Sequence, residues 1–128
     1  MGKWLRQALS DLQAARDSLK NGHHEWACFQ AQQAGEKALK SFLYSRGYTS
    51  ILSHSLTELV RTAGKLEPEF HSVDKPARRL DTFYIPTRYP NGLAGELTPS
   101  EFYKQEDANQ CLNSAESILN ITRKFTNN

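Results

Sequence analysis

Residues 24–46 read HEWACFQAQQAGEKALKSFLYSR, and this stretch decides the fold. Small and apolar side chains recur in it every three or four residues, which is the spacing of one helix face. This apolar line consists of Ala27, Ala31, Ala34, Ala38 and Phe42. A row of four alanines lets a second helix approach closely, so we expect 24–46 to be the central packing helix.

A second line on the same segment is polar. Steps of three and four residues place its members on one face of a helix: Gln30, Gln33, Lys37, Lys40 and Tyr44. Such a line is either a solvated face, which the periodicity alone favours, or one wall of a cleft or a subunit interface. Glu36 and Lys40 also stand in the favourable order for an i,i+4 ion pair.

Helical spacing of apolar residues also marks 3–20, 55–65 and 101–125, and part of 69–82. Asn21-Gly22 and Gly47 are expected to end the first two helices, and Ser55-Leu56-Thr57-Glu58 has the form of a capping box. Neither strand alternation nor an internal repeat is present. The sequence predicts an all-α protein, an up-and-down bundle of four main helices plus a short fifth, in a single domain over residues 1–128.

The composition argues against several classes of protein. With 16 Lys+Arg against 14 Asp+Glu, the net charge of +2 lacks the basic excess typical of nucleic-acid binding, although a local basic site stays open. Cys28 and Cys111 lie in apolar helical patterns, which indicates reduced, buried thiols in a cytoplasmic protein. Zinc-ligand spacing, a signal peptide and a membrane-length apolar run are absent, so we expect no metal, no cofactor and no membrane.

The segment Phe83–Gly92, FYIPTRYPNG, interrupts the helical patterns. Its two prolines cannot lie in one helix interior, which makes the segment irregular but stiff. It carries two tyrosines and Arg88. The segment is either a binding loop held by a rigid scaffold, or a connection whose aromatic rings fill the core.

Standard catalytic and phosphate-cradle motifs are missing from the sequence. The remaining chemistry is a cationic site with an aromatic rim. Arginine suits phosphate because its planar fork donates two parallel hydrogen bonds, and tyrosine can stack on a base. A histidine beside a helix start is more often a structural partner than a functional group. The candidate binding residues are Lys37, Lys40, His54, Tyr84, Arg88 and Tyr89.

The stretch from Trp26 to Lys40 resembles the second-helix motif of HEPN domains. His54 ahead of a leucine-rich helix, and the run from Tyr84 to Pro90, are also similar to that family. The resemblance extends from about Trp4 to Phe125. It covers small stand-alone prokaryotic HEPN proteins and the carboxy-terminal HEPN domain of sacsin.

The resemblance implies homodimers whose cleft near the two-fold axis holds polar and basic residues. It also implies one of two activities, nucleotide binding or metal-independent RNA cleavage. HEPN ribonucleases carry an arginine followed, four to six residues later, by a histidine. Here the residues four to six positions after Arg88 are Gly92, Leu93 and Ala94. The last histidine of the chain, His71, comes before Arg88.

Three hypotheses follow. The favoured one is a non-catalytic dimeric module that binds a nucleotide or another phosphate-bearing ligand, with Arg88 and Lys40 on phosphate and Tyr84 or Tyr89 on the base. The second is a toxin-like ribonuclease that uses Arg88 and His54 and is restrained by a nucleotidyltransferase-type partner; RNA is the less favoured ligand. The third is a pure dimerisation module of a chaperone-linked, sacsin-like protein.

Overall fold

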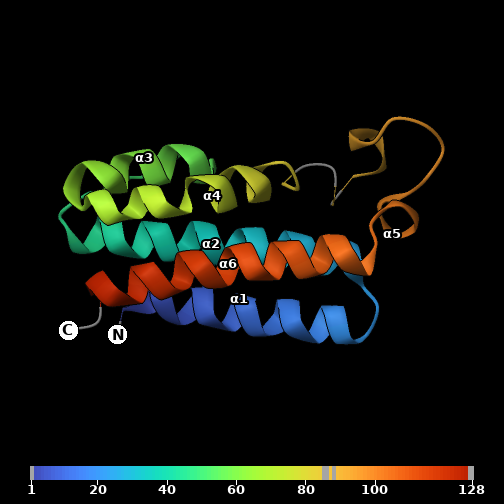
Figure 1. The fold of residues 1–128 in the computed structure, drawn as a ribbon, viewed down its shortest axis with the longest axis horizontal. Coiled ribbons are helices and arrows are strands. Elements are labelled where there is room, and N and C mark those ends of the chain that lie inside the picture. Colours follow the sequence, from blue (N-terminus) through green and yellow to red (C-terminus); the bar gives the residue numbers. More distant parts are fainter. Residues whose placement is uncertain (1, 85–86, 88, 127–128) are drawn as a thin grey trace.

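The computed structural model describes residues 2–84, 87 and 89–126, and this part of the chain is helical without strands. Three long helices, α1 (Lys3–Lys20), α2 (His24–Ser45) and α6 (Gln105–Thr126), lie side by side. The shorter α3 (Leu56–Leu66) and α4 (Asp74–Asp81) form a further layer over α2 and α6 (Figure 1). The predicted all-α bundle is therefore confirmed, although the described residues form six α-helices where four main helices and a short fifth were expected.

The alanine line of α2 forms the centre of the bundle, as expected. Ala27, Ala31, Ala34, Ala38 and Phe42 are completely buried. Gly35 adds a close approach on the same helix, because a Cβ there would lie 2.7 Å from a methyl carbon of Leu56 and 3.3 Å from one of Leu80. The small residues of α2 thus let α3 and α4 pack directly on its backbone.

The predicted helix ends agree closely with the structure. Gly22 and Gly47 have φ of 80° and 95°, the left-handed conformation that ends a helix. At the start of α3, the Ser55 hydroxyl accepts a hydrogen bond from the Glu58 N–H at 3.2 Å. The return half of the capping box runs through Ser53, whose hydroxyl donates to Glu58 and accepts from the Ser55 N–H.

Residues 69–82 are helical in part, as expected: they begin as a 3-10 helix, η1 (Pro68–Val73), and continue as α4 (Asp74–Asp81). One expectation about the helices needs correction. The expected helix over 101–125 is divided into α5 (Pro99–Phe102) and α6, with Tyr103 extended between them. Two separate helix starts cause the division, because Glu101 accepts the Thr98 N–H and Asp107 accepts the Lys104 N–H.

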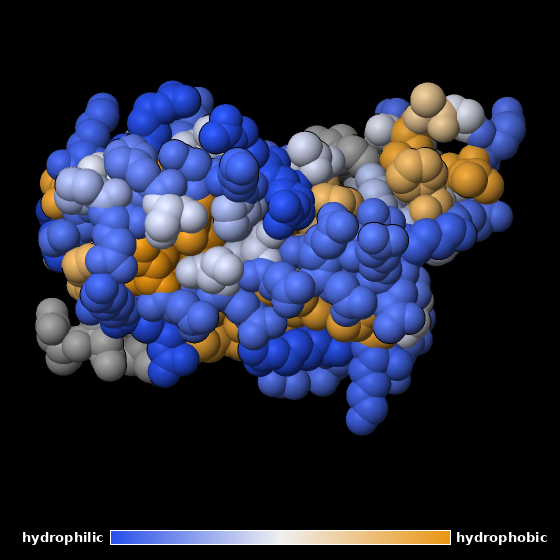
Figure 2. Space-filling model, viewed as in Figure 1, coloured by the Kyte–Doolittle hydropathy of each residue, from blue (hydrophilic) through white to orange (hydrophobic). Residues whose placement is uncertain are grey.

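A second short 3-10 helix, η2 (Pro90–Gly92), forms the end of the proline-containing segment. The viewed face of the molecule is mostly hydrophilic (Figure 2). Apolar surface gathers where the α3–α4 layer meets α6, and again at the end that carries α5, where Leu97 and Phe102 are exposed. None of the helices in the described ranges is long and apolar enough to cross a bilayer.

Candidate functional site

His54 is the most exposed group of a buried polar cluster between α2 and α3. Its Nδ1 lies 3.1 Å from Oε2 of Glu36, so the ring nitrogen can donate to the carboxylate. The His54 side chain is 58% exposed, whereas that of Glu36 is 6% exposed. This arrangement leaves Nε2 as the imidazole nitrogen that can exchange a proton with a ligand.

Glu36 and Lys40 form a buried ion pair behind His54. Nζ of Lys40 donates to Oε2 of Glu36 at 3.0 Å, and both side chains are 6% exposed. The same carboxylate oxygen of Glu36 therefore contacts both Lys40 and His54. The other, Oε1, is buried and has no hydrogen-bond partner within residues 2–84, 87 and 89–126.

Tyr84 forms an aromatic wall beside His54. The two rings are stacked, with centroids 5.6 Å apart and planes inclined by 16°. Phe29 of α2 lies behind Tyr84, with a centroid distance of 6.4 Å. A hollow of about 240 Å³ opens at this point, lined by His54, Ser55, Asp81 and Tyr84.

Asp81 connects the hollow to the start of α3, a role that the sequence did not reveal. Its carboxylate accepts the N–H groups of Leu56 and Thr57 at 2.8 and 3.0 Å, and the hydroxyl groups of Ser55 and Thr57 at 3.1 and 2.7 Å. An acidic side chain at a helix N-terminus stabilises the positive end of the dipole. No local sequence signal predicts this contact, because about 25 residues separate its partners.

Lys37 lies apart from this hollow. Its Nζ is 2.6 Å from Oδ2 of Asp11 on α1, and it borders a different hollow together with Lys3, Trp4 and Gln7. Tyr44 packs its ring against Trp4, with centroids 5.4 Å apart. The expectation of a solvated polar line on α2 is therefore wrong, since Lys40 is buried and the other four members are half-buried. Gln30 and Lys37 contact α1, and Tyr44 contacts α1 and the following loop.

The proline-containing segment is described only in part. Arg88 lies outside the described residues, and so do Ile85 and Pro86. Thr87 is buried, and its hydroxyl donates to the Phe83 carbonyl. The Tyr89 side chain is about half exposed, at 49%. Of the six candidate residues, the structure brings His54, Tyr84 and Lys40 together, with Glu36 as the shared contact of the lysine and the histidine.

The two cysteines and the acidic groups complete the chemistry of the described residues. Cys28 and Cys111 are buried and free, as expected, and both their mutual hydrogen bond and burial raise the pKa of Cys111. A cluster of three or more His, Cys, Asp or Glu side chains able to hold a metal does not occur in the described part. The functional groups that the structure brings together at the hollow are thus the Glu36 carboxylate, the His54 imidazole and the Tyr84 ring.

Comparison with known proteins places the chain in a family. It is 28% identical over 130 residues to the protein named "Putative toxin MJ1304" of Methanocaldococcus jannaschii, covering 95% of this chain and 85% of that protein. Human sacsin is 24% identical over 120 residues, which span 91% of this chain but 3% of sacsin.

Solved structures are also similar over almost the whole chain. TT1696 from Thermus thermophilus is 36% identical with a TM-score of 0.81, covering 94% of both chains. ST0689, an archaeal HEPN homologue, is 35% identical with a TM-score of 0.78, covering 97% of this chain and 98% of that one. The HEPN domain model matches residues 1–125. The chain therefore belongs to the HEPN domain family.

Proposed function

We propose that this HEPN protein is a cytoplasmic homodimer that binds a nucleotide or another phosphate-bearing ligand at the hollow beside His54. The observation that carries the proposal is the pairing of His54 with buried Glu36 on one edge and with the Tyr84 ring on its face. With Nδ1 of His54 held on Glu36, the Nε2 N–H of a protonated His54 could donate a charge-assisted hydrogen bond to phosphate.

The other candidate residues take different roles around this centre. Arg88 would hold phosphate through its planar fork, and the half-exposed ring of Tyr89 would pack on the base. Lys40 would act through Glu36, because its amine is buried against that carboxylate. Lys37 would hold α2 to α1 through Asp11 and would not contact the ligand.

Calorimetric titration with ATP and GTP tests this function. We expect Arg88→Ala and His54→Gln each to weaken binding about tenfold or more, since each removes a charged hydrogen bond. Arg16→Ala is the matched control, because Arg16 pairs with Glu116 on the surface of α1 and α6. Absence of binding by the parent protein, or equal effects of Arg88→Ala and Arg16→Ala, would exclude the assigned site.

The Glu36–His54 pair also supports a second candidate, metal-independent RNA cleavage. A histidine oriented by a carboxylate is a suitable general base. His54 Nε2 would take the proton of a ribose 2′-hydroxyl and O2′ would attack phosphorus. The P–O5′ bond would break as a water molecule gives its proton to the leaving 5′-oxygen, and the product would be a 2′,3′-cyclic phosphate. His54 would replace the histidine that is missing after Arg88, and a nucleotidyltransferase-type protein would be the restraining partner.

Incubation of RNA with the protein in excess EDTA separates the two functions. A ribonuclease should cleave under these conditions, and both His54→Gln and Arg88→Ala should lower the rate by about 10²-fold or more. Intact RNA with retained nucleotide binding would eliminate cleavage and leave the binding function.

Analytical ultracentrifugation over a range of concentrations tests the homodimer. A dimer that binds no ligand would favour the third hypothesis, a pure dimerisation module of a sacsin-like, chaperone-linked protein.

A further inference from the structure

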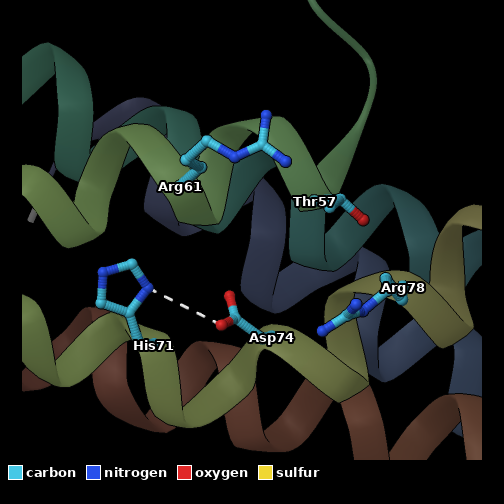
Figure 3. Close-up of a pocket in the computed structure, with 5 residues that line it drawn as sticks. All are labelled: Thr57, Arg61, His71, Asp74 and Arg78. Carbon is cyan, nitrogen blue, oxygen red and sulfur yellow. Dashed lines mark ion pairs between the residues drawn. The ribbon is translucent and has the colours of Figure 1, made fainter.

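A second hollow lies between α3 and α4, apart from the one at His54. Its volume is about 140 Å³, and it is lined by Thr57, Arg61, His71, Asp74 and Arg78. Thr57 and Arg61 are four residues apart on α3, and Asp74 and Arg78 are four residues apart on α4, so each pair lies on one helix face. Figure 3 shows the two helices facing each other across the hollow, with His71 of η1 at one end.

The two arginines are uncompensated in the described part of the chain. Neither Arg61 nor Arg78 makes an ion pair or a side-chain hydrogen bond there, and both are exposed. Apart from Asp74, the carboxylates of α3, η1 and α4 have partners of their own: Glu58 accepts from Ser53, Glu69 pairs with Lys124, and Asp81 caps α3. Asp74 lies 3.7 Å from His71, so the hollow keeps a positive charge with either protonation state of the histidine.

The position of His71 is defined by close packing. A Cβ on Gly64 would lie 2.4 to 3.0 Å from three atoms of the imidazole ring, so the ring rests on the bare backbone of α3. The ring therefore stands at the rim of the hollow together with the two guanidinium groups (Figure 3). The Thr57 hydroxyl already donates a hydrogen bond to Asp81. This leaves Arg61, Arg78 and His71 as the hydrogen-bond donors for a ligand.

The size of the hollow selects the ligand. At about 140 Å³ this hollow has little more than half the volume of the hollow at His54, which is about 240 Å³. Its volume suits a single tetrahedral oxyanion better than a ligand that also carries a sugar and a base. Two arginines with their planar donor forks are suited to a phosphate that carries two negative charges.

We propose that the hollow between α3 and α4 binds the phosphate of a phosphomonoester, with Arg61 and Arg78 as its charge partners and His71 as a third donor. This site is independent of the hollow at His54, and either site could exist without the other. The carboxylate of Asp74 opposes the anion, so it limits the affinity and provides a diagnostic variant.

NMR titration of the ¹⁵N-labelled protein with inorganic phosphate, at constant ionic strength, tests the site. We expect saturable shifts of the amide signals of residues 57–61 and 71–78. The double variant Arg61→Gln/Arg78→Gln should weaken binding at least about tenfold, because two charge-assisted contacts are lost. Lys65→Gln/Lys75→Gln is the matched control, since it removes the same charge from the same two helices outside the hollow.

Two further variants and two ligands complete the experiment. Asp74→Asn should tighten phosphate binding several-fold, and Arg16→Gln, which removes a surface charge outside both hollows, should leave it unchanged. Methyl phosphate should bind as tightly as inorganic phosphate, and dimethyl phosphate, with one charge fewer, about tenfold more weakly. Equal losses in the arginine and lysine variants, a lack of tightening by Asp74→Asn, or failure of methyl phosphate to bind would each overturn the proposal.

Discussion

Lys40 illustrates how the surroundings of one side chain change the meaning of a sequence pattern. Glu36 and Lys40 are correctly predicted as an i,i+4 pair, which in water contributes a few tenths of a kcal/mol. In the structure both charges are almost fully buried, and the carboxylate also receives His54. The sequence could not reveal this burial, because it depends on a loop ten or more residues farther along the chain.

Removing only one partner of this pair should be strongly destabilising. We expect Lys40→Met to lower the free energy of unfolding by about 3–5 kcal/mol, since it leaves a buried carboxylate without its lysine. The double variant Glu36→Gln/Lys40→Met should recover a large part of that loss. Urea denaturation measures both values. A single variant as stable as the parent would show that the ion pair does not balance a buried charge.

At the scale of the elements, local signals predicted the helix ends well. Glycine and a capping box act within a few residues, so α1 and α2 end and α3 begins within one residue of the expected positions. The same rule explains the division of α5 from α6, because the Thr98–Glu101 and Lys104–Asp107 contacts are also local. Asp81 at the start of α3 is different, since only the packing of α4 beside α3 brings it there.

The Asp81 contact leads to a prediction about the α3 helix. We expect Asp81→Asn to lower stability by about 1–2 kcal/mol, because the first turn loses a charged cap and its favourable dipole interaction. Hydrogen exchange of the Leu56 and Thr57 amides should become faster. Asp17→Asn, at an exposed position of α1, should change neither quantity measurably.

For the whole molecule, Tyr103 links the α5 end to the bundle. Its side chain is 6% exposed, and its ring centroid lies 5.5 Å from that of Phe83 and 5.0 Å from that of Phe102. Burial is the main cause that raises the pKa of Tyr103 to about 12. The neighbouring Cys28, Asp107 and Cys111 add to the effect. The folded state therefore holds the phenol proton more tightly than the unfolded chain.

This pKa predicts the pH dependence of folding in alkali. Below the ordinary tyrosine pKa of about 10 the phenol is neutral in both states, so its contribution to stability is fully present. Between pH 10 and about 12 the unfolded chain loses the proton first, and stability falls. Tyr103→Phe should flatten this fall in denaturation measured from pH 9 to 12, and ultraviolet titration should lose its latest phenolate step. An unchanged late step would contradict the assignment.

The position of Asp81 has a consequence for competition between anions. A helix N-terminus is a ready anion site, but that of α3 already holds a carboxylate from the same chain. A tethered group acts at an effective concentration that reaches the millimolar range or more even with a flexible connection. A phosphate from solution would have to exceed that concentration to displace Asp81. The tether therefore directs external anions away from the backbone of α3 and toward the side chains on either side of it.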